Sequence, residues 1–307
     1  MKQTVFLRIF SALATALLLF SAALLTGCGR GEEPDTTKDP FAVVTTEPTT
    51  SDAATTEAPS EDSSASGGGS DTAEPYTPQQ MAGAVPQSER ADASYFDDVV
   101  FVGDSVSVKL FYYNALNKVL GNAEFLTAGS LSCANALWPV NSQSVHPTWE
   151  GQKMLLEDSV PLTGKKTLYI MLGMNDIAVY GIDKSVENMQ TLLTKIKANV
   201  PDLKIVIQSM TPIASTSKLL KDNGLCPANI DAYNKKLLQL CLDNGYSFVD
   251  VASVMYDEDG YLKREYCSDP DNMGVHFTDA GEAAYTVEFY DAAGVLIGAV
   301  SDSIIVE

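Results

Sequence analysis

The chain has 307 residues and a formal net charge of −20 at pH 7, from 40 acidic and 20 basic residues. This acidic balance, without a basic stripe, argues against nucleic-acid binding. Its cysteines lack metal-ligand spacing, and no phosphate-cradling loop appears, so the sequence implies no metal and no cofactor.

The N-terminus is similar to the signal of bacterial lipoproteins. Lys2 and Arg8 precede an apolar run over residues 9–25, which leads into LTGC, ending at Cys28. In such a lipobox the Cys is acylated and becomes the mature N-terminus. We therefore expect a signal peptide over 1–27 and a lipid on Cys28 that holds the chain at the bacterial cell surface, outside the cytoplasm. A cleaved secretory signal or a membrane anchor is the alternative, although the run is short for a spanning helix.

Residues 28–92 have a different composition, rich in Thr, Ser, Pro, Ala and Gly, and 13 acidic against 3 basic residues fall between 29 and 92. Large apolar side chains are too few to offset the entropy lost on ordering. We expect a disordered, self-repelling tether in front of a folded domain over 93–307.

Short apolar runs alternate with helical patterns along that domain. The predicted strands are 99–102, 124–127, 167–172, 204–208 and 248–251. The predicted helices are 108–120, 186–200, 230–242 and a last one from Thr278 through the alanine-rich region 283–299, with a break at Gly294 left open. This alternation indicates an α/β domain with a parallel sheet and helices on both faces.

Polar residues collect where the predicted strands end. GDS follows the first strand at 103–105, AGS the second at 128–130 and GMND the third at 173–176, while GVH at 274–276 precedes the last helix. Sites in parallel sheets form at the carboxyl ends of strands. These junctions offer a hydroxyl nucleophile, a backbone N–H, an amide donor and an imidazole base, which acyl transfer requires.

These four blocks, in this order, resemble the SGNH/GDSL hydrolases (GDSL esterase/lipase family). The resemblance implies a flavodoxin-like three-layer α/β/α sandwich with a five-stranded parallel sheet. It also implies that Ser105 is the nucleophile and His276 the general base. The backbone N–H groups of Ser105 and Gly129 and the Asn175 amide would form the oxyanion hole.

One position departs from the family pattern. Family members usually carry an Asp three residues before the His, and Met273 stands there in this chain. A thioether cannot usefully orient an imidazole. Asp271 is the leading candidate to replace it, with Asp269, a backbone carbonyl or an impaired site as alternatives.

The favoured function is a cell-surface serine esterase that removes an acetyl or other short acyl group from a carbohydrate. An impaired, glycan- or envelope-binding lipoprotein and a lipase or acyltransferase of the same family are the alternatives. The sequence does not name the acyl group, the alcohol or the oligomeric state.

Two further features stay open at this point. The remaining cysteines are either buried thiols or paired, with a bridge between Cys226 and Cys267 as one option; they are Cys133, Cys226, Cys241 and Cys267. His146, the other histidine, is expected at the rim or surface, and Ser107 is expected to face away from the site.

Overall fold

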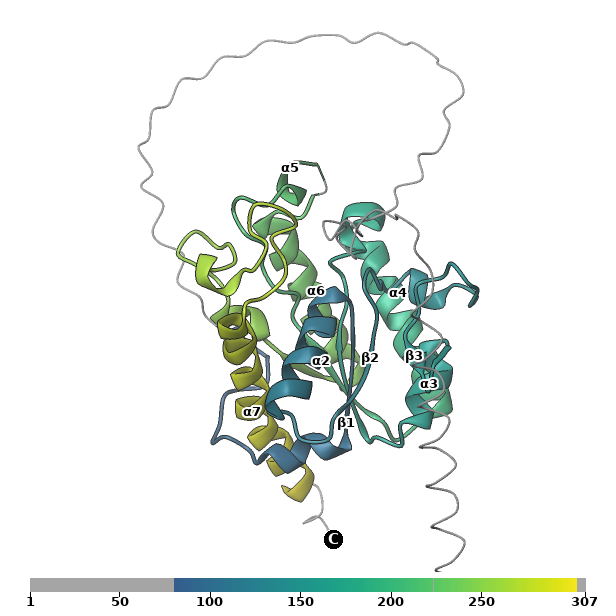
Figure 1. Cartoon of the computed structure of the whole chain (residues 1–307). Coiled ribbons are helices and arrows are strands. Elements are labelled where there is room, and N and C mark those ends of the chain that lie inside the picture. Colours follow the sequence, from purple (N-terminus) through teal and green to yellow (C-terminus); the bar gives the residue numbers. More distant parts are fainter. Residues whose placement is uncertain (1–79, 223, 303–307) are drawn as a thin grey trace, which may run out of the picture. The chain divides into compact units, whose positions relative to one another are not determined.

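A computed structural model describes residues 80–222 and 224–302 of the chain (Figure 1). The predicted signal peptide, Cys28 and most of the tether lie outside the described residues. Five parallel strands form the main sheet in the order β2-β1-β5-β6-β7. Their bounds are Val99–Gly103 (β1), Glu124–Thr127 (β2), Thr167–Met171 (β5), Lys204–Gln208 (β6) and Ser247–Val249 (β7). This is the doubly wound order of flavodoxin-like sheets, so the predicted fold class is confirmed.

Helices cover both faces of the sheet because successive strand residues point to opposite sides. In β1, Val100 and Val102 enter one apolar cluster, and Val99 and Phe101 enter the other. Figure 1 shows α2 and α7 on one side of the strands and α3 and α4 on the other. The helices are α2 (Ser105–Asn117), α3 (Leu156–Leu162), α4 (Ile177–Asn199), α5 (Leu219–Asp222), α6 (Pro227–Asn244) and α7 (Asp279–Asp302).

Local sequence sets several helix ends. Asp104 caps α2 by accepting the N–H of Val106 at 3.0 Å. Pro227 opens α6 at a position whose N–H needs no partner, and Gly245 ends it with a left-handed φ of 67°. These signals explain why the structure places α2 and α6 close to the predicted ranges.

Some elements depart from the predictions. α4 begins at Ile177, earlier than residue 186, because a first turn joins the main helix through Gly181, whose φ is 73°. α7 runs past Gly294 without a break. The hairpin of β3 (Thr148–Trp149) and β4 (Gln152–Lys153) was not predicted, since two-residue strands carry no periodic pattern. The short 3₁₀ helices are η1 (Ala93–Asp98), η2 (Asn135–Leu137), η3 (Val251–Val254) and η4 (Arg264–Tyr266).

The end of the predicted tether is part of the folded domain. The backbone N–H of Val85 donates to the Phe248 carbonyl of β7 at 2.8 Å. The N–H of Met81 donates to the buried Asp250 carboxylate at 2.8 Å. The domain therefore begins before residue 93, because the apolar side chains near residues 81–85 cover the edge of the sheet.

The described residues contain neither a disulfide nor a helix suited to span a membrane. Cys133, Cys226, Cys241 and Cys267 are free, so the bridge considered between Cys226 and Cys267 is not formed. No helix within 80–222 or 224–302 combines the length and the apolar character that a bilayer span needs.

Candidate active site

The register of the sheet brings three of the predicted blocks to one edge. Gly103, the last residue of β1, pairs with Thr127 of β2 and with Met171 of β5. The chain therefore leaves all three strands at the same level, toward Ser105, Gly129 and Asn175. Parallel pairing alone produces this convergence, because the strands share one direction.

The fourth block, which contains His276, joins the other three through a side-chain contact. The Nε2 atom of His276 lies 3.0 Å from the Oγ of Ser105, although 171 positions separate the two residues. Ser105 is the first residue of α2, so the helix holds its hydroxyl at the sheet edge. The distance of 3.0 Å between Nε2 and Oγ allows direct proton transfer from the hydroxyl to the imidazole.

A carboxylate orients the other side of the ring, and it belongs to Asp269. Its Oδ2 lies 2.7 Å from Nδ1 of His276. Its Oδ1 accepts the backbone N–H groups of Val275 and His276, each at 3.1 Å. Burial raises the pKa of Asp269, but the hydrogen bonds from the ring and backbone of His276 outweigh burial, so the pKa lies below its ordinary value. An ionised carboxylate at Nδ1 fixes the tautomer that leaves Nε2 free to accept a proton.

Asp271, the leading sequence candidate for this position, does not contact the ring. Its carboxylate faces Arg264 at 3.6 Å, and its side chain is 76% exposed. The reason is the shape of the loop, which closes as a narrow hairpin. Cys267 and Phe277 form an antiparallel bridge, and the N–H of Ser268 donates to the carbonyl of His276 at 2.9 Å. Ser268 therefore lies opposite His276, and the carboxylate of the next residue, Asp269, is close enough to reach the ring.

The loop after β6 holds this hairpin from outside. The Ser217 hydroxyl donates to the carbonyl of Met273 at 2.5 Å, and the N–H of Ala214 donates to the carbonyl of Gly274 at 2.8 Å. Met273, the residue at the usual Asp position, packs its side chain against the apolar core. The orienting Asp thus precedes the His by 7 residues instead of the usual three, and hydrogen bonds from the loop after β6 stabilise this longer turn.

Three predicted N–H donors lie on the segments that follow β1, β2 and β5. The N–H of Ser105 is at the first position of α2, where a helix offers it no acceptor. Within the part of the chain that the structure describes, the Gly129 N–H donates to no other group. The amide nitrogen of Asn175 is held at 3.2 Å from Oδ2 of Asp104 and at 3.1 Å from the carbonyl of Leu131.

Asp176, the next residue, holds the loop after β2 in place. Its two carboxylate oxygens accept the N–H groups of Cys133 at 2.9 Å and Ala134 at 3.0 Å. The residue is fully buried, and burial raises its pKa. The sequence placed Asp176 in the third block but gave it no role, because only the fold shows which loop it contacts.

The model of the GDSL-like Lipase/Acylhydrolase family matches residues 143–284, which include Asn175 and His276. Within the folded domain, residues 143–284 are therefore similar to the GDSL-like lipases and acylhydrolases. A GDSL-like lipase from Bacteroides thetaiotaomicron VPI-5482 has a similar structure, with 16% identity, 67% of this chain and 92% of that chain covered, and a TM-score of 0.50. A candidate acylhydrolase from Bacteroides fragilis NCTC 9343 is 17% identical, with 69% of this chain and 91% of that chain covered and a TM-score of 0.50. At these identities the likeness concerns the fold. No curated protein matches the chain.

Two glycines show how tightly the blocks pack. Gly173 has a φ of 141°, and a Cβ there would lie 2.3 Å from the Tyr233 ring. A Cβ on Gly103 would lie 2.0 Å from the Ser107 hydroxyl. Both blocks of the SGNH/GDSL pattern therefore need glycine for close approach.

Two other residues lie where the sequence did not fully place them. His146, expected at the rim or surface, is buried, with Nδ1 2.9 Å from the Ser144 hydroxyl, and burial lowers its pKa. Ser107 is buried on α2 beside Gly103. Neither belongs to the hydrogen-bonded group around the Ser105 hydroxyl.

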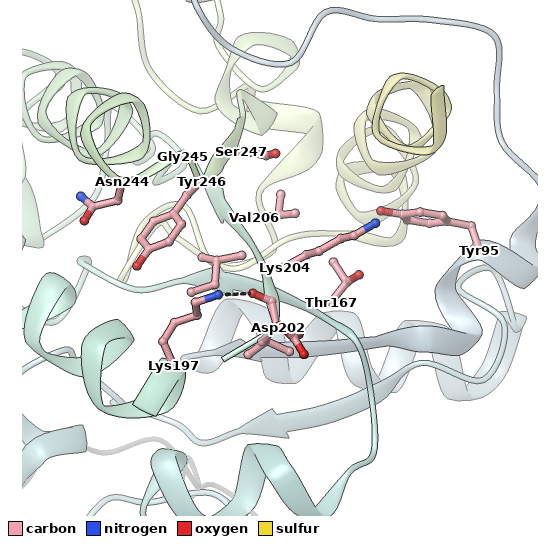
Figure 2. Close-up of a pocket in the computed structure, with 12 residues that line it drawn as sticks. Tyr95, Thr167, Lys197, Asp202, Lys204, Val206, Asn244, Gly245, Tyr246 and Ser247 are labelled. Atoms are coloured by element: carbon pink, nitrogen blue, oxygen red, sulfur yellow. Dashed lines mark hydrogen bonds between the residues drawn. The ribbon is translucent and has the colours of Figure 1, made fainter. Parts of the chain in front are cut away.

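A hollow of about 460 Å³ lies at the amino ends of the strands, whereas the four blocks lie at their carboxyl ends (Figure 2). The amino ends of β5, β6 and β7 contribute Thr167, Lys204 and Ser247 to its lining. The Lys197 ammonium beside it donates to the Leu203 carbonyl at 3.1 Å. None of its twelve lining residues is a histidine or cysteine, so this hollow offers no imidazole for hydrolysis.

Proposed function

We propose that this chain is a lipid-anchored, extracytoplasmic esterase that removes an acetyl or another short acyl group from a carbohydrate. Ser105 is the nucleophile, His276 the general acid and base, and Asp269 the carboxylate that orients the ring. The observation that carries the proposal is the continuous contact from the Ser105 hydroxyl through the imidazole to Asp269, at 3.0 Å and 2.7 Å.

The geometry supports a two-step hydrolysis. Ser105 Oγ attacks the ester carbonyl while its proton passes to Nε2 of His276. The tetrahedral intermediate collapses, the C–O bond to the alcohol breaks, and Nε2 returns the proton to the departing oxygen. Water then attacks the acyl-enzyme by the same route, which releases the carboxylic acid and restores Ser105.

The negative charge that develops on the carbonyl oxygen needs donors already in place. We assign this role to the backbone N–H groups of Ser105 and Gly129 and to the Asn175 amide. Removal of one such donor typically lowers turnover by about 10²- to 10³-fold. Asn175→Ala should therefore lower kcat by about that factor, with a smaller effect on KM.

Asp269 also favours an enzyme over a binding module on an inactive frame. That alternative was motivated by Met273, which leaves no carboxylate at the usual position. With Asp269 2.7 Å from Nδ1 of His276, the ring has a charged partner, and the motive for an inactive site is removed.

The substrate class rests on exposed side chains in the segments after two of the blocks and on the N-terminal signal. Exposed apolar side chains occupy the segments that follow the second and third blocks, namely Trp138, Val140, Val179 and Tyr180. The rings of Trp138 and Tyr180 suit sugar rings, and apolar side chains of this kind also suit short acyl groups. A lipid on Cys28 would keep the domain near envelope glycans.

The decisive experiment measures hydrolysis of nitrophenyl esters from acetyl to dodecanoyl by the wild type and Ser105→Ala, with Ser107→Ala as matched control. We expect highest kcat/KM on the shortest acyl groups, loss of activity in Ser105→Ala only, and acetate release from acetylated glycans. A serine-directed phosphonate should label Ser105. Retained activity in Ser105→Ala refutes the assignment, and a preference for long chains favours a lipase.

The location is tested separately. Cys28→Ser should move the protein from the membrane fraction to the soluble fraction and abolish incorporation of labelled fatty acid. Unchanged fractionation and labelling would refute the lipid anchor without touching the hydrolase assignment.

A further inference from the structure

The turn that carries His276 is folded around Asp269, which accepts several of its backbone N–H groups. The main-chain carbonyl of Asp269 accepts the N–H of Asn272 at 2.9 Å and that of Gly274 at 3.0 Å. Its carboxylate accepts the next two N–H groups, those of Val275 and His276, each at 3.1 Å. The residue that orients the imidazole is therefore also the residue that holds the inside of the turn.

The carbonyl groups of the same turn accept hydrogen bonds from residues 214–218 of the loop after β6, a segment that we call the clamp. Two of the donors are hydroxyl groups and two are backbone N–H groups. The pairs are the Thr216 hydroxyl with Pro270 (2.8 Å), the Lys218 N–H with Asn272 (2.9 Å), the Ser217 hydroxyl with Met273 (2.5 Å) and the Ala214 N–H with Gly274 (2.8 Å).

Two peptide units of the turn connect the clamp to Asp269. A peptide unit is planar and trans, so its C=O and N–H groups point in opposite directions. The carbonyl of Met273 and the N–H of Gly274 belong to one unit. This unit accepts from Ser217 on one side and donates to the main-chain carbonyl of Asp269 on the other. The next unit accepts from the clamp in the same way and donates, through the N–H of Val275, to the Asp269 carboxylate.

We propose that Ser217 is a positioning residue that keeps the Asp269 carboxylate against His276, an inference that rests on the proposed function. Ser217 is 4% exposed, and its Oγ accepts the Leu219 N–H at 3.1 Å, which leaves its proton for the Met273 carbonyl. Without the hydroxyl, this carbonyl loses its donor and the peptide unit behind it is free to rotate. The N–H of that unit then leaves Asp269, and the carboxylate shifts relative to the ring.

The length of the turn explains why it needs a clamp. Asp269 precedes His276 by 7 residues, and a longer loop loses more conformational freedom when it is ordered. Gly274 has a φ of 71°, and a Cβ there would lie 2.7 Å from the Cβ of Ser217. The absence of a side chain at Gly274 lets the clamp come close enough to hydrogen-bond to the turn.

The test is a double-mutant cycle in the full chain with Ser217→Ala and Asp269→Asn, measured as kcat and KM for nitrophenyl acetate. Displacement of a catalytic group by about 1 Å costs about 100-fold in rate. We expect Ser217→Ala to lower kcat by about 5- to 50-fold with KM within about 2-fold. When residue 269 is already asparagine, the loss should be less than about 2-fold, because the contact that Ser217 maintains is absent.

The matched control is Thr163→Val, which removes a hydroxyl with the same kinds of contact. The Thr163 hydroxyl donates to the Val160 carbonyl at 2.7 Å and accepts the Lys165 N–H at 3.3 Å. It lies between α3 and β5, before the amino end of the strand, and we expect kcat within about 2-fold of the wild type. A loss in Thr163→Val comparable to that in Ser217→Ala would assign the effect to general loosening of the fold and would overturn the proposal.

Equal losses from Ser217→Ala in both backgrounds, or no loss in the wild-type background, would also overturn it. If Ser217→Ala does not fold, Ser217→Cys enters the same cycle with the same criterion, since a thiol is a weak donor that cannot make the 2.5 Å contact. The two proposals fail separately. Activity in Ser105→Ala removes the proposed function, whereas an inactive Ser105→Ala with equal losses in the cycle removes only the role of Ser217.

Discussion

Replacing Asp269 by asparagine tests the orientation of the imidazole. In the wild type, Oδ1 of Asp269 accepts two backbone N–H groups, and Oδ2 faces Nδ1 of His276. Asparagine has one acceptor oxygen, which the two backbone donors will retain. Its NH₂ group then faces Nδ1 and requires that atom to accept. The ring responds by carrying its proton on Nε2, where it can no longer take the proton of Ser105.

The size of the effect follows from this change of tautomer. In an unrelated serine protease, the same change of the orienting Asp lowered kcat by about 10⁴-fold. Here the carboxylate makes the same kind of contact at 2.7 Å, so we expect a loss of about 10³- to 10⁴-fold, equivalent to about 4–5.5 kcal/mol. KM should change by less than about 3-fold, because the carboxylate does not touch the substrate.

The assay is steady-state hydrolysis of nitrophenyl acetate, with thermal unfolding to confirm that the variants fold. Asp271→Asn is the matched control, since it is the same substitution on the same loop at a side chain that is 76% exposed. We expect Asp271→Asn to stay within about 2-fold of the wild type, as for other exposed ion pairs. The reasoning is refuted if Asp269→Asn retains a tenth of the activity, or if Asp271→Asn loses more.

Two predictions concern stability. Glu282 is fully buried in the first turn of α7, and burial raises its pKa from 4.5 to about 8. The stabilisation of the folded state by the protonated Glu282 side chain is fully present below pH 4.5. It is lost as the pH rises through about 8, because the carboxyl ionises at lower pH in the unfolded chain than in the folded chain. In urea unfolding, the free energy of unfolding of Glu282→Gln relative to that of the wild type should therefore increase by about 2–4 kcal/mol from pH 5 to pH 8. An equal difference between the two proteins at both pH values would contradict this. A chain that begins at Ala93 loses the Val85 and Met81 hydrogen bonds and leaves the Asp250 carboxylate with one partner fewer. It should unfold about 4–12 °C lower than a chain that begins at Gln80; equal melting temperatures would show that residues 80–92 do not stabilise the domain.

Much of the fold could be predicted from the sequence because its signals are local. Apolar runs of four to six residues between helical patterns give the strands, and burial on both faces explains why these runs do not alternate. The blocks that contain Ser105, Gly129 and Asn175 follow directly, since the carboxyl ends of parallel strands meet at one edge. Predictions were weakest where structure depends on partners, as in the segment 80–92, whose few apolar residues matter only against the edge of β7.

The orienting carboxylate shows the limit most clearly. Spacing along the chain describes a single turn well, and by that measure Asp271 is nearer to His276 than Asp269 is. In the structure the loop closes as a hairpin, so contact depends on which residues lie opposite each other. The bridge between Cys267 and Phe277 sets this pairing. Turn-forming residues between them, such as Pro270 and Gly274, predict a turn but do not fix its register.

The sequence by itself determined the α/β architecture, the order of the four blocks and the residue types that acyl transfer needs. Only the tertiary structure decided which carboxylate meets His276, that Asp104 contacts Asn175 and that Asp176 holds the loop after β2. The physical reason is one of range. Strand and helix patterns depend on neighbours a few residues apart, whereas a hydrogen bond between distant side chains depends on sheet register and loop closure, which become fixed only when the whole domain packs.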